Sequence, residues 1–265
     1  MVYVDNAVFI VQLKDRRDEY LIRSLRADGY KTQVMDETID NLTGRPVYLF
    51  SMTTQVASSD IVRLSEDAIV FLNTLNPELY DYAQKSNTMF VEYLDDESFL
   101  MKNAQLTAEG ALSHILTCTP KSIRDTSVLI MGYGRVGKAC SLLFYDNHIN
   151  LAVVNRSELR LAEALVITDK IYTLSEAPYY FDDFDIIINT IPACVLTIDN
   201  LKMMREDTVI IDLASSPGGV DSSVAKSLGI EVVQALGLPG KIAPATAAEN
   251  IKSFIIKDAG FKFKK

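Results

Sequence analysis

The sequence contains few of the residues that most often bind metals or form disulfides. It has three cysteines and two histidines among its 265 residues. Cys118, Cys140 and Cys194 lie far apart in apolar stretches and include no Cys-x-x-Cys pair, so neither a disulfide framework nor a zinc site is supported. The sequence also has no cluster of His, Asp and Glu with the spacing of metal ligands. It has no motif typical of a catalytic nucleophile either. We therefore predict core thiols in a reducing cytoplasm and no bound metal.

Positive charge is scarce as well. The chain has 26 Lys and Arg against 35 Asp and Glu, a net charge of −9. Nucleic acids and anionic membrane surfaces bind clustered cations that replace counterions, so we expect neither partner. The most apolar long stretch, residues 185–196, is interrupted by Asn189, Thr190 and Pro192, so no membrane span is predicted. No N-terminal signal precedes the first predicted strand, and we expect residues 261–265 to be a solvated tail.

Apolar residues make up 48% of the chain, enough for two domains with cores of their own. In the first 100 residues strands alternate with helices, which predicts a parallel sheet covered on both faces. The predicted strands are 7–13, 47–51, 68–72 and 89–93, and the predicted helices are 15–27 and one that starts near Pro77. A helix predicted over residues 243–257 returns to this domain. We assign residues 1–102 and 243–265 to a flavodoxin-like substrate domain.

Residues 103–242 fit a second α/β domain. It opens with an amphipathic helix over residues 105–117, which is well placed to bridge the two domains. Six predicted strands follow, over residues 127–131, 150–154, around 171, 184–189, 208–213 and 230–234. This alternation is typical of a complete Rossmann dinucleotide-binding domain. The predicted fold class is therefore α/β with two doubly wound parallel-sheet domains.

A glycine motif follows the first strand of the second domain. It consists of Gly132, Tyr133, Gly134, Arg135, Val136 and Gly137, a Gly-x-Gly-x-x-Gly pattern between a strand and a helix. In a dinucleotide-binding turn the first glycine permits the tight turn, the second lets the backbone approach a pyrophosphate, and the third lets helix and strand pack closely. The pyrophosphate would bind the N–H groups at the helix start. The alternative is a purely structural turn.

The end of the second strand of this domain predicts which nucleotide binds. An acidic residue there would accept hydrogen bonds from the ribose of NAD, but the sequence has Asn155, Arg156 and Ser157. No carboxylate repels a 2′-phosphate, Arg156 offers a charge-assisted pair of hydrogen bonds, and Ser157 offers a hydroxyl. We therefore predict NADP. The alternative is that Asn155 and Ser157 only cap the helix predicted over residues 158–165.

Loops after the later strands are candidates for the nicotinamide environment, because ligands of open α/β sheets lie beyond the carboxyl ends of the strands. Three loops rich in Gly and Pro have this position: 190–192, 214–219 and 236–241. The cofactor candidates in the first two loops are Thr190, Ile191, Pro192, Ala214 and Ser215. Each loop could also be an ordinary turn between a strand and a helix.

Two charged residues are candidates for the substrate side. Arg17, or its neighbour Arg16, follows the first strand of the first domain and could bind a substrate carboxylate through two hydrogen bonds. Glu109 lies on the bridging helix and could act as a general acid or base. For each of them a solvated helix side chain is the alternative. Asp15, just before these arginines, could be a helix N-cap.

Five stretches together resemble the A subunit of dipicolinate synthase: residues 103–110, 131–137, 188–192, 211–219 and 238–247. The resemblance covers residues 103 to about 250 and is thinner in the first domain, where Asp15, Arg17 and the following helix match. It implies an enzyme that reduces NADP while it oxidises dihydrodipicolinate to dipicolinate, the calcium chelator of bacterial spores. It also implies a flavoprotein-like B subunit as partner. In this family context Arg17 and Lys241 would bind the two carboxylates of a small dicarboxylate substrate, and Glu109 would accept the proton.

Two other functions remain open. One is an NADP-linked dehydrogenase or reductase that acts on another small carboxylated imine or keto acid. The other is a non-catalytic NADP-binding subunit that regulates its partner.

We also expect a homo-oligomer. The broader likeness is to two-domain dehydrogenases of the 2-hydroxyacid and alanine dehydrogenase kind.

Overall fold

The structure is a computed structural model that describes residues 2–35, 44–57, 60, 64, 67–258 and 260–263. The chain divides into two compact units: Met1–Asn103 with Pro239–Lys265, and Ala104–Leu238. Each unit contains a parallel sheet with helices on both faces, so the predicted fold class is confirmed. Residues 239–242, which we assigned to the second domain, cluster with the first unit, where Gly240 lies against Asp15 and Arg17.

The first unit is built on a five-stranded parallel sheet with the order β3-β2-β4-β5-β6. Its strands are β2 (Ala7–Val11), β3 (Lys31–Val34), β4 (Arg45–Leu49), β5 (Ile69–Leu72) and β6 (Met89–Glu92). Counted along the chain this order is 2-1-3-4-5, which is the flavodoxin-like arrangement. The order reverses between β2 and β4, so a ligand of this sheet is expected beyond the carboxyl ends of these two strands.

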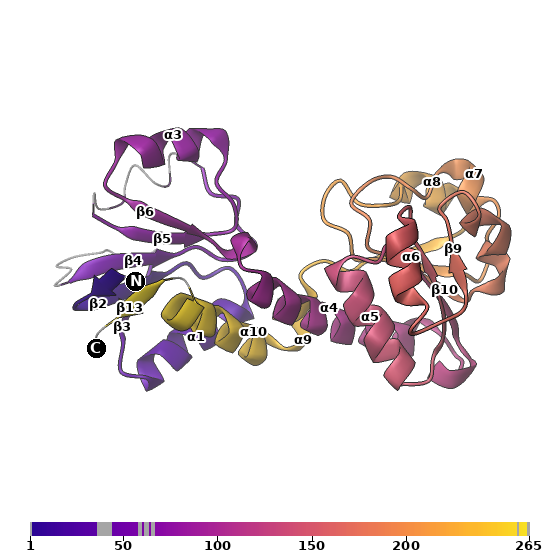
Figure 1. Ribbon diagram of the computed structural model, residues 1–265, viewed down its shortest axis with the longest axis horizontal. Helices are drawn as coiled ribbons and strands as arrows, with labels where there is room; N and C mark the ends of the chain where they lie inside the picture. The colour runs from indigo at the N-terminus through magenta and orange to yellow at the C-terminus, as the bar shows by residue number, and fades with distance from the viewer. Residues whose placement is uncertain are drawn as a thin grey trace. The chain divides into compact units, whose positions relative to one another are not determined.

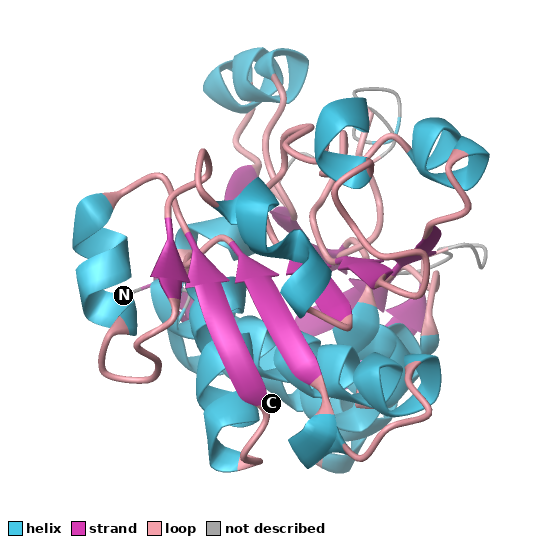
Figure 2. Cartoon of the chain, turned by 90° about the vertical axis from the view of Figure 1, so that its right-hand side faces the viewer, coloured by secondary structure: helices cyan, strands magenta, loops and turns pink. Residues whose placement is uncertain are grey.

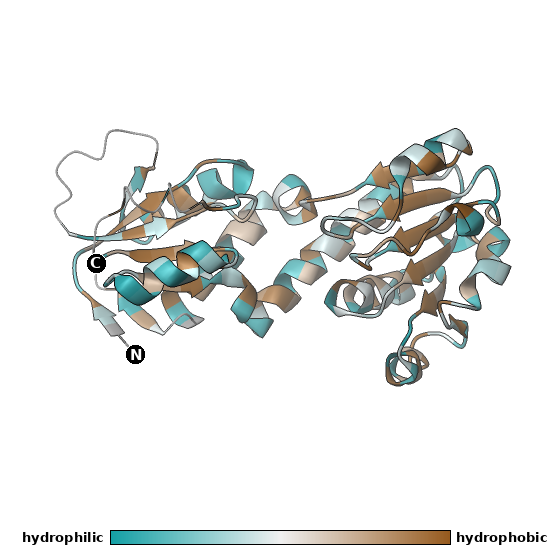
Figure 3. Cartoon of the chain, turned by 90° about the horizontal axis from the view of Figure 1, so that it is seen from above, coloured by the Kyte–Doolittle hydropathy of each residue, from teal (hydrophilic) through white to brown (hydrophobic). Residues whose placement is uncertain are grey.

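Helices cover both faces of this sheet (Figure 1). They are α1 (Arg16–Ala27), α3 (Pro77–Lys85) and α10 (Pro244–Ser253), which continues as a π-helical segment over Phe254–Asp258. Alternate residues of each strand point to opposite faces. Thus Phe9 and Val11 belong to the core that includes α1 and α10, while Ile10 packs in the core beside Leu79 of α3. Figure 3 shows the resulting apolar strands beneath helices with polar outer faces.

The two ends of the chain form a small sheet that we did not predict. Strand β1 (Val2–Val4) pairs in parallel with β13 (Phe261–Phe263). Phe261 and Phe263 are buried and alternate with exposed Lys262, and the Phe263 ring centroid lies 5.1 Å from that of Phe9. The prediction of a solvated tail is therefore wrong for residues 261–263, and residues 264 and 265 lie outside the described residues. The apolar period of two, rather than the lysine content, decides the local structure.

A long helix, α4 (Glu97–Cys118), contains the segment that we predicted as the bridging helix. It begins earlier than predicted because the Asp96 carboxylate accepts a hydrogen bond from the Phe99 backbone N–H at 2.6 Å, as an N-cap does. No helix in the described part of the chain combines the length and the apolar character that a membrane crossing requires.

The second unit has a six-stranded parallel sheet with the order β12-β11-β10-β7-β8-β9. Its strands are β7 (Ser127–Met131), β8 (Asn150–Val154), β9 (Ile171–Tyr172), β10 (Ile186–Asn189), β11 (Val209–Asp212) and β12 (Glu231–Gln234). Figure 2 shows neighbouring strands pointing in one direction with helices around them. Counted along the chain the order is 3-2-1-4-5-6, the Rossmann arrangement, and it reverses between β7 and β10.

Two apolar layers enclose this second sheet. The helices are α5 (Arg135–Asp146), α6 (Glu158–Ala164), α7 (Ile198–Leu201), α8 (Ser222–Ser227) and α9 (Leu238–Ile242), the last of which begins at the unit boundary. Val128 and Ile130 pack in the core that includes α4 and α5, whereas Leu129 and Met131 pack in the opposite one. Strand β7 is therefore buried on both faces, as its run of apolar residues predicted.

The three thiols are all free, as predicted, but only Cys140 belongs to the buried core. Cys118 is half-buried, and Cys194 is exposed. The prediction of core thiols is therefore wrong for Cys194, which lies in the loop after β10 rather than in an apolar element.

Candidate dinucleotide and substrate sites

The glycine motif forms a tight turn between β7 and α5, at the point where the strand order reverses. Gly132 has a φ of 99°, a left-handed conformation that favours glycine, and its N–H donates to the Val154 carbonyl at 2.8 Å. A Cβ at Gly132 would overlap Oγ1 of Thr190. That hydroxyl in turn donates to the Met131 carbonyl at 2.9 Å. The first glycine is therefore required by the turn itself.

The other two glycines of the motif have opposite surroundings. A Cβ at Gly137 would overlap the Gly132 carbonyl, so this glycine lets α5 approach the turn. Around Gly134 a Cβ would meet no atom within 4 Å, and its φ of −82° suits any residue. Gly134 is also the N-cap of α5, and no side chain caps the helix there. Neither packing nor backbone strain explains this glycine.

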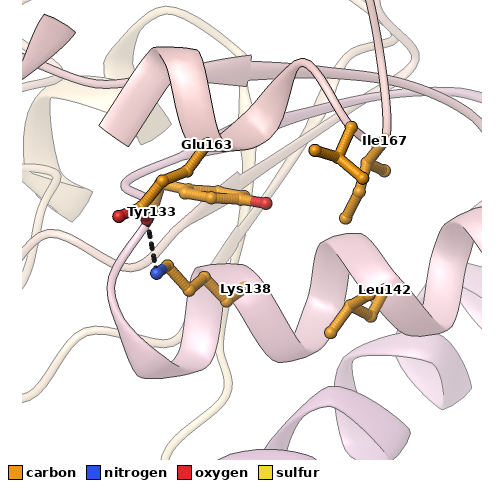
Figure 4. Close-up of a pocket in the computed structure, with 6 residues that line it drawn as sticks. Tyr133, Lys138, Leu142, Glu163 and Ile167 are labelled. Carbon is orange, nitrogen blue, oxygen red and sulfur yellow. Dashed lines mark ion pairs between the residues drawn. The ribbon is translucent and has the colours of Figure 1, made fainter. Parts of the chain in front are cut away.

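Tyr133 does not direct its ring toward the open side of the turn. Its side chain is buried and lines a hollow of about 270 Å³ between α5 and α6, together with Lys138, Leu142, Glu163 and Ile167 (Figure 4). Lys138 Nζ lies 2.5 Å from Glu163 Oε2 and 5.5 Å from the Tyr133 ring centroid. Burial, assisted by the Glu163 charge, raises the pKa of Tyr133. This residue could therefore contact a cofactor through its backbone only.

The segment after β8 holds the predicted nucleotide-selecting residues. Asn155 Oδ1 accepts from the Ser157 N–H at 2.9 Å, and Ser157 caps α6, with its Oγ 3.5 Å from the Arg160 backbone nitrogen. The capping role that we considered for these two residues is thus real. Arg156 is exposed and makes no ion pair with any residue that the structure describes. Its guanidinium is therefore available to a ligand.

Arg160 is a candidate that the prediction missed. It lies one helical turn after Arg156 and is exposed at the same end of α6. Its Nη1 is 3.0 Å from Glu163 Oε2, so Glu163 joins Arg160 to Lys138 of α5. The spacing of four residues between the two arginines could have indicated it.

The loops after β10 and β11 contain Thr190, Ile191 and Pro192, and Ala214 and Ser215. Ala214 is buried, whereas Pro192 and Ser215 are exposed. Both loops are held by residues that the prediction did not select, Asn189 and Asp212, which are fully buried at the last positions of the two strands. Asn189 Nδ2 donates to Asp212 Oδ1 at 2.8 Å. Polar residues that end an otherwise apolar strand were the available signal.

Arg17 lies at the start of α1 and is buried, not solvated. Its Nη2 is 2.6 Å from Asp15 Oδ2, and its Nε also donates to this carboxylate. Asp15 is at the same time the N-cap of α1, in a capping box with Asp18. Burial alone would raise the pKa of Asp15, but hydrogen bonds and the charge of Arg17 lower it below its usual value. Nη1 of Arg17 makes no hydrogen bond within the described residues.

A polar cluster surrounds this position at the carboxyl ends of β2 and β4. Gln12 Oε1 accepts from the Ser51 N–H at 3.2 Å and from the Thr54 hydroxyl at 2.6 Å. Asp18 is buried nearby and accepts from the Lys14 N–H at 2.8 Å, and burial raises its pKa. In this chain the two loops that border the switch point of the first sheet are therefore tied together by the side chain of Gln12.

The other two candidate catalytic residues are exposed. Lys241 lies on α9, directly after Gly240. Glu109 lies on α4, next to Gly110, where an added Cβ would be 2.7 Å from Leu238 Cβ. Glu109 and Lys241 form no ion pair with any other described residue. No group of His, Cys, Asp and Glu in the described ranges could hold a metal ion.

Comparison with known proteins agrees with this arrangement. Residues 115–235 match the family model of shikimate / quinate 5-dehydrogenase. The fold is also similar to that of the transhydrogenase from Sinorhizobium meliloti, with a TM-score of 0.69 and 16% identity over 94% of this chain and 93% of that one. The fold and the open glycine turn, together with these similarities, define an NAD(P)-dependent oxidoreductase that uses a nicotinamide dinucleotide.

Two similar proteins are A subunits of dipicolinate synthase. The A subunit of dipicolinate synthase from Bacillus subtilis (strain 168) is 30% identical over 195 residues, which are 74% of this chain and 66%, slightly under two thirds, of that protein. The crystal structure of the dipicolinate synthase A subunit from Bacillus halodurans has a TM-score of 0.84 and 25% identity, and the match covers 97% of this chain and 99% of that one. The chain is therefore similar to dipicolinate synthase A subunits, the family that the sequence motifs predicted.

Proposed function

We propose that this chain uses NADP to oxidise dihydrodipicolinate to dipicolinate, as the A subunit beside a flavoprotein-like B subunit and as a homo-oligomer. The observation that carries the proposal is the unobstructed turn at Gly134 in a chain of this family. The names of both relatives describe an A subunit, which supports a second, partner subunit. The substrate and the partner come from those relatives, and the cofactor preference comes from residues of this chain.

The preference for NADP is supported by the end of β8. Arg156 is exposed without an ion-pair partner in the described part of the chain, and no carboxylate is present at Asn155 or Ser157. A 2′-phosphate would accept charge-assisted hydrogen bonds from Arg156, and Arg160 one turn later adds a second guanidinium. In Arg156→Asp the new carboxylate would repel the 2′-phosphate of NADP. It would instead accept a hydrogen bond from the free ribose 2′-hydroxyl of NAD. An unchanged ratio of the Kd values for NADP and NAD in this variant would contradict the assignment.

The chemistry requires few groups from the protein. Dihydrodipicolinate loses one hydride and one proton and becomes an aromatic pyridine, and bound NADP supplies the hydride acceptor. The chain must hold the substrate ring and the nicotinamide ring next to each other in the orientation for hydride transfer, and it must accept the proton. We assign the proton to Glu109 and the two substrate carboxylates to Arg17 and Lys241. Because Asp15 bonds Nε and Nη2 of Arg17, the Nη1 side is the one left for a substrate carboxylate.

Substitutions test these roles. Glu109→Gln should lower kcat about 100-fold, as expected for a lost general base. Arg17→Ala should raise KM for the dicarboxylate more than it lowers kcat, and Arg16→Ala is the matched control because Arg16 is exposed on the same helix turn. Equal effects of the two arginine substitutions would contradict the assignment of Arg17.

Two alternatives have distinct outcomes in the same assay. Turnover only with another small carboxylated imine or keto acid would indicate a related dehydrogenase. The hydrogen bond between Gln12 and Thr54 joins the two loops at the switch point of the first sheet. A substrate pocket beside these loops could be shaped for a different acid, so this related dehydrogenase is the second candidate. Tight NADPH binding without turnover of any candidate acid, with or without the B subunit, would indicate a regulatory role.

A further inference from the structure

Two adjacent strands of the second sheet end in a pair of fully buried polar residues. Asn189 ends β10 and Asp212 ends β11, and the two residues are register partners. Both are 0% exposed, and Asn189 Nδ2 lies 2.8 Å from Asp212 Oδ1. Every other residue of these two strands is apolar. Polar groups at such a position are costly unless they are hydrogen-bonded, so the contacts of this pair indicate its role.

The pair holds two loops at once. Asn189 makes two bonds to Ile191: its Oδ1 accepts from the backbone N–H at 3.2 Å and its Nδ2 donates to the carbonyl at 3.1 Å. Asp212 Oδ1 accepts from the Ala214 N–H at 3.1 Å, and Oδ2 accepts from the Gly219 N–H at 3.0 Å. The loops 190–192 and 214–219 are thereby fixed to each other through two side chains.

The carboxylate of Asp212 has hydrogen-bond donors but no cation. Gln234 adds a longer contact, with its Nε2 3.4 Å from Oδ2. No Lys, Arg or His among the described residues forms an ion pair with Asp212. Both carboxylate oxygens of Asp212 accept hydrogen bonds from backbone N–H groups. The loop also approaches closely, because a Cβ at Gly219 would overlap the Asn189 amide. The hydrogen bonds of this buried carboxylate therefore hold the loop and the Asn189 side chain, and none comes from a cation among the described residues.

The position of Asn189 and Asp212 in the sheet indicates which part of a bound dinucleotide would lie near them. The strand order β11-β10-β7-β8 places the glycine turn after β7 in the middle. Arg156, the proposed contact of the 2′-phosphate, lies after β8 on one side of this turn. The loops that Asn189 and Asp212 hold lie after β10 and β11, on the other side. A dinucleotide whose pyrophosphate binds at Gly134 therefore extends its nicotinamide half toward these two loops.

We propose that Asn189 and Asp212 are positioning residues that set the shape of the nicotinamide half of the cofactor site without touching the adenosine half. This inference rests on the proposed NADP function. It goes beyond that function because it assigns the affinity for one half of the cofactor to a buried hydrogen-bonded pair. The pair acts through its hydrogen bonds to the backbones of Ile191, Ala214 and Gly219. In this proposal these backbones border the nicotinamide ring.

Two ligands separate the halves of the site. NADP⁺ occupies both, whereas adenosine 2′,5′-bisphosphate lacks the nicotinamide and occupies the adenosine half only. Asp212→Asn keeps the shape of the side chain but turns an N–H toward one of the two backbone donors. By calorimetric titration this variant should bind NADP⁺ about tenfold more weakly and the bisphosphate as well as the unaltered protein does. Arg156→Ala is the matched control and should weaken both ligands.

A second variant tests the same idea if Asp212→Asn does not fold. Gly219→Ala leaves the carboxylate in place but displaces the loop from Asn189, and it should give the same pattern. Equal weakening of both ligands in these variants, or no weakening of NADP⁺, would overturn the positioning role. Failure of the unaltered protein to bind either ligand would instead overturn the proposed cofactor, and this inference with it.

Discussion

Gly240 lies against the side chain of Arg17: a Cβ at position 240 would be 2.6 Å from Arg17 Nε and 3.1 Å from Asp15 Oδ2. Arg17 cannot move aside freely because it is buried and bonded to Asp15. Gly240→Ala should therefore displace this pair and lower the free energy of unfolding by about 1–3 kcal/mol, as overpacking does. Urea denaturation measures the change.

The same substitution in an Arg17→Ala background provides the control. Without the guanidinium only the contact with Asp15 Oδ2 at 3.1 Å remains, so Gly240→Ala should then cost less than it does in the unaltered protein. Equal costs in both backgrounds would show that the contact between Gly240 and Arg17 does not limit this position.

Gly134 and Gly137 should respond differently to the same change. Gly134→Ala should reduce stability by only about 1 kcal/mol, the cost of a poorer N-cap, but weaken NADP binding at least about tenfold, because its methyl enters the space of the pyrophosphate. Gly137→Ala should destabilise the fold itself, because its Cβ would overlap the Gly132 carbonyl. Thermal unfolding and cofactor titration together measure both effects. Undiminished NADP binding by Gly134→Ala would contradict the site.

Asp185 anchors the amino-terminal edge of the second sheet. Burial would raise the pKa of Asp185, but Lys121 at 2.7 Å, the Ser127 N–H at 2.9 Å and Arg205 at 2.6 Å together hold it well below its usual value. Asp185→Asn should therefore lower the free energy of unfolding by about 2 kcal/mol near neutral pH, because hydrogen bonds to a charged group are lost.

The pH dependence of this loss has a definite sign. The folded-state pKa of Asp185 is depressed, so its contribution is complete above the unfolded-state value of about 3.9 and is lost as the pH falls toward the folded-state value. The difference between Asp185→Asn and the unaltered protein should thus shrink in urea denaturation below pH of about 4. A difference that is independent of pH would contradict this interpretation.

Apolar runs and glycines predicted most of the fold. The strands 127–131 and 150–154 match β7 and β8 residue for residue, because both are buried on two faces and bounded by polar residues or glycine. Strand β3 was missed because its sequence, Lys31–Val34, is mostly polar and lies at a sheet edge. Strand β13 has three residues and pairs with the other end of the chain, a relation that no local pattern contains.

The candidate sites were less accessible to sequence reasoning. Local motifs indicated the glycine turn and Arg156, because their roles depend on neighbouring residues. The hydrogen bonds of Asn189 with Asp212 join positions 23 residues apart in the chain, and those of Gln12 with Thr54 join positions 42 apart. Such pairs are set by strand order, which becomes known only with the sheet. The prediction therefore located the glycine turn but not the residues that hold the loops beside it.

The most direct test of the proposed function is the formation of NADPH from NADP⁺ with freshly generated dihydrodipicolinate, measured by absorbance with and without the B subunit. We expect NADPH to form in a fixed ratio to dipicolinate, at a rate that Glu109→Gln lowers about 100-fold and Arg16→Ala leaves unchanged. Binding of NADPH without any NADPH formation, with the B subunit present, would contradict the proposal.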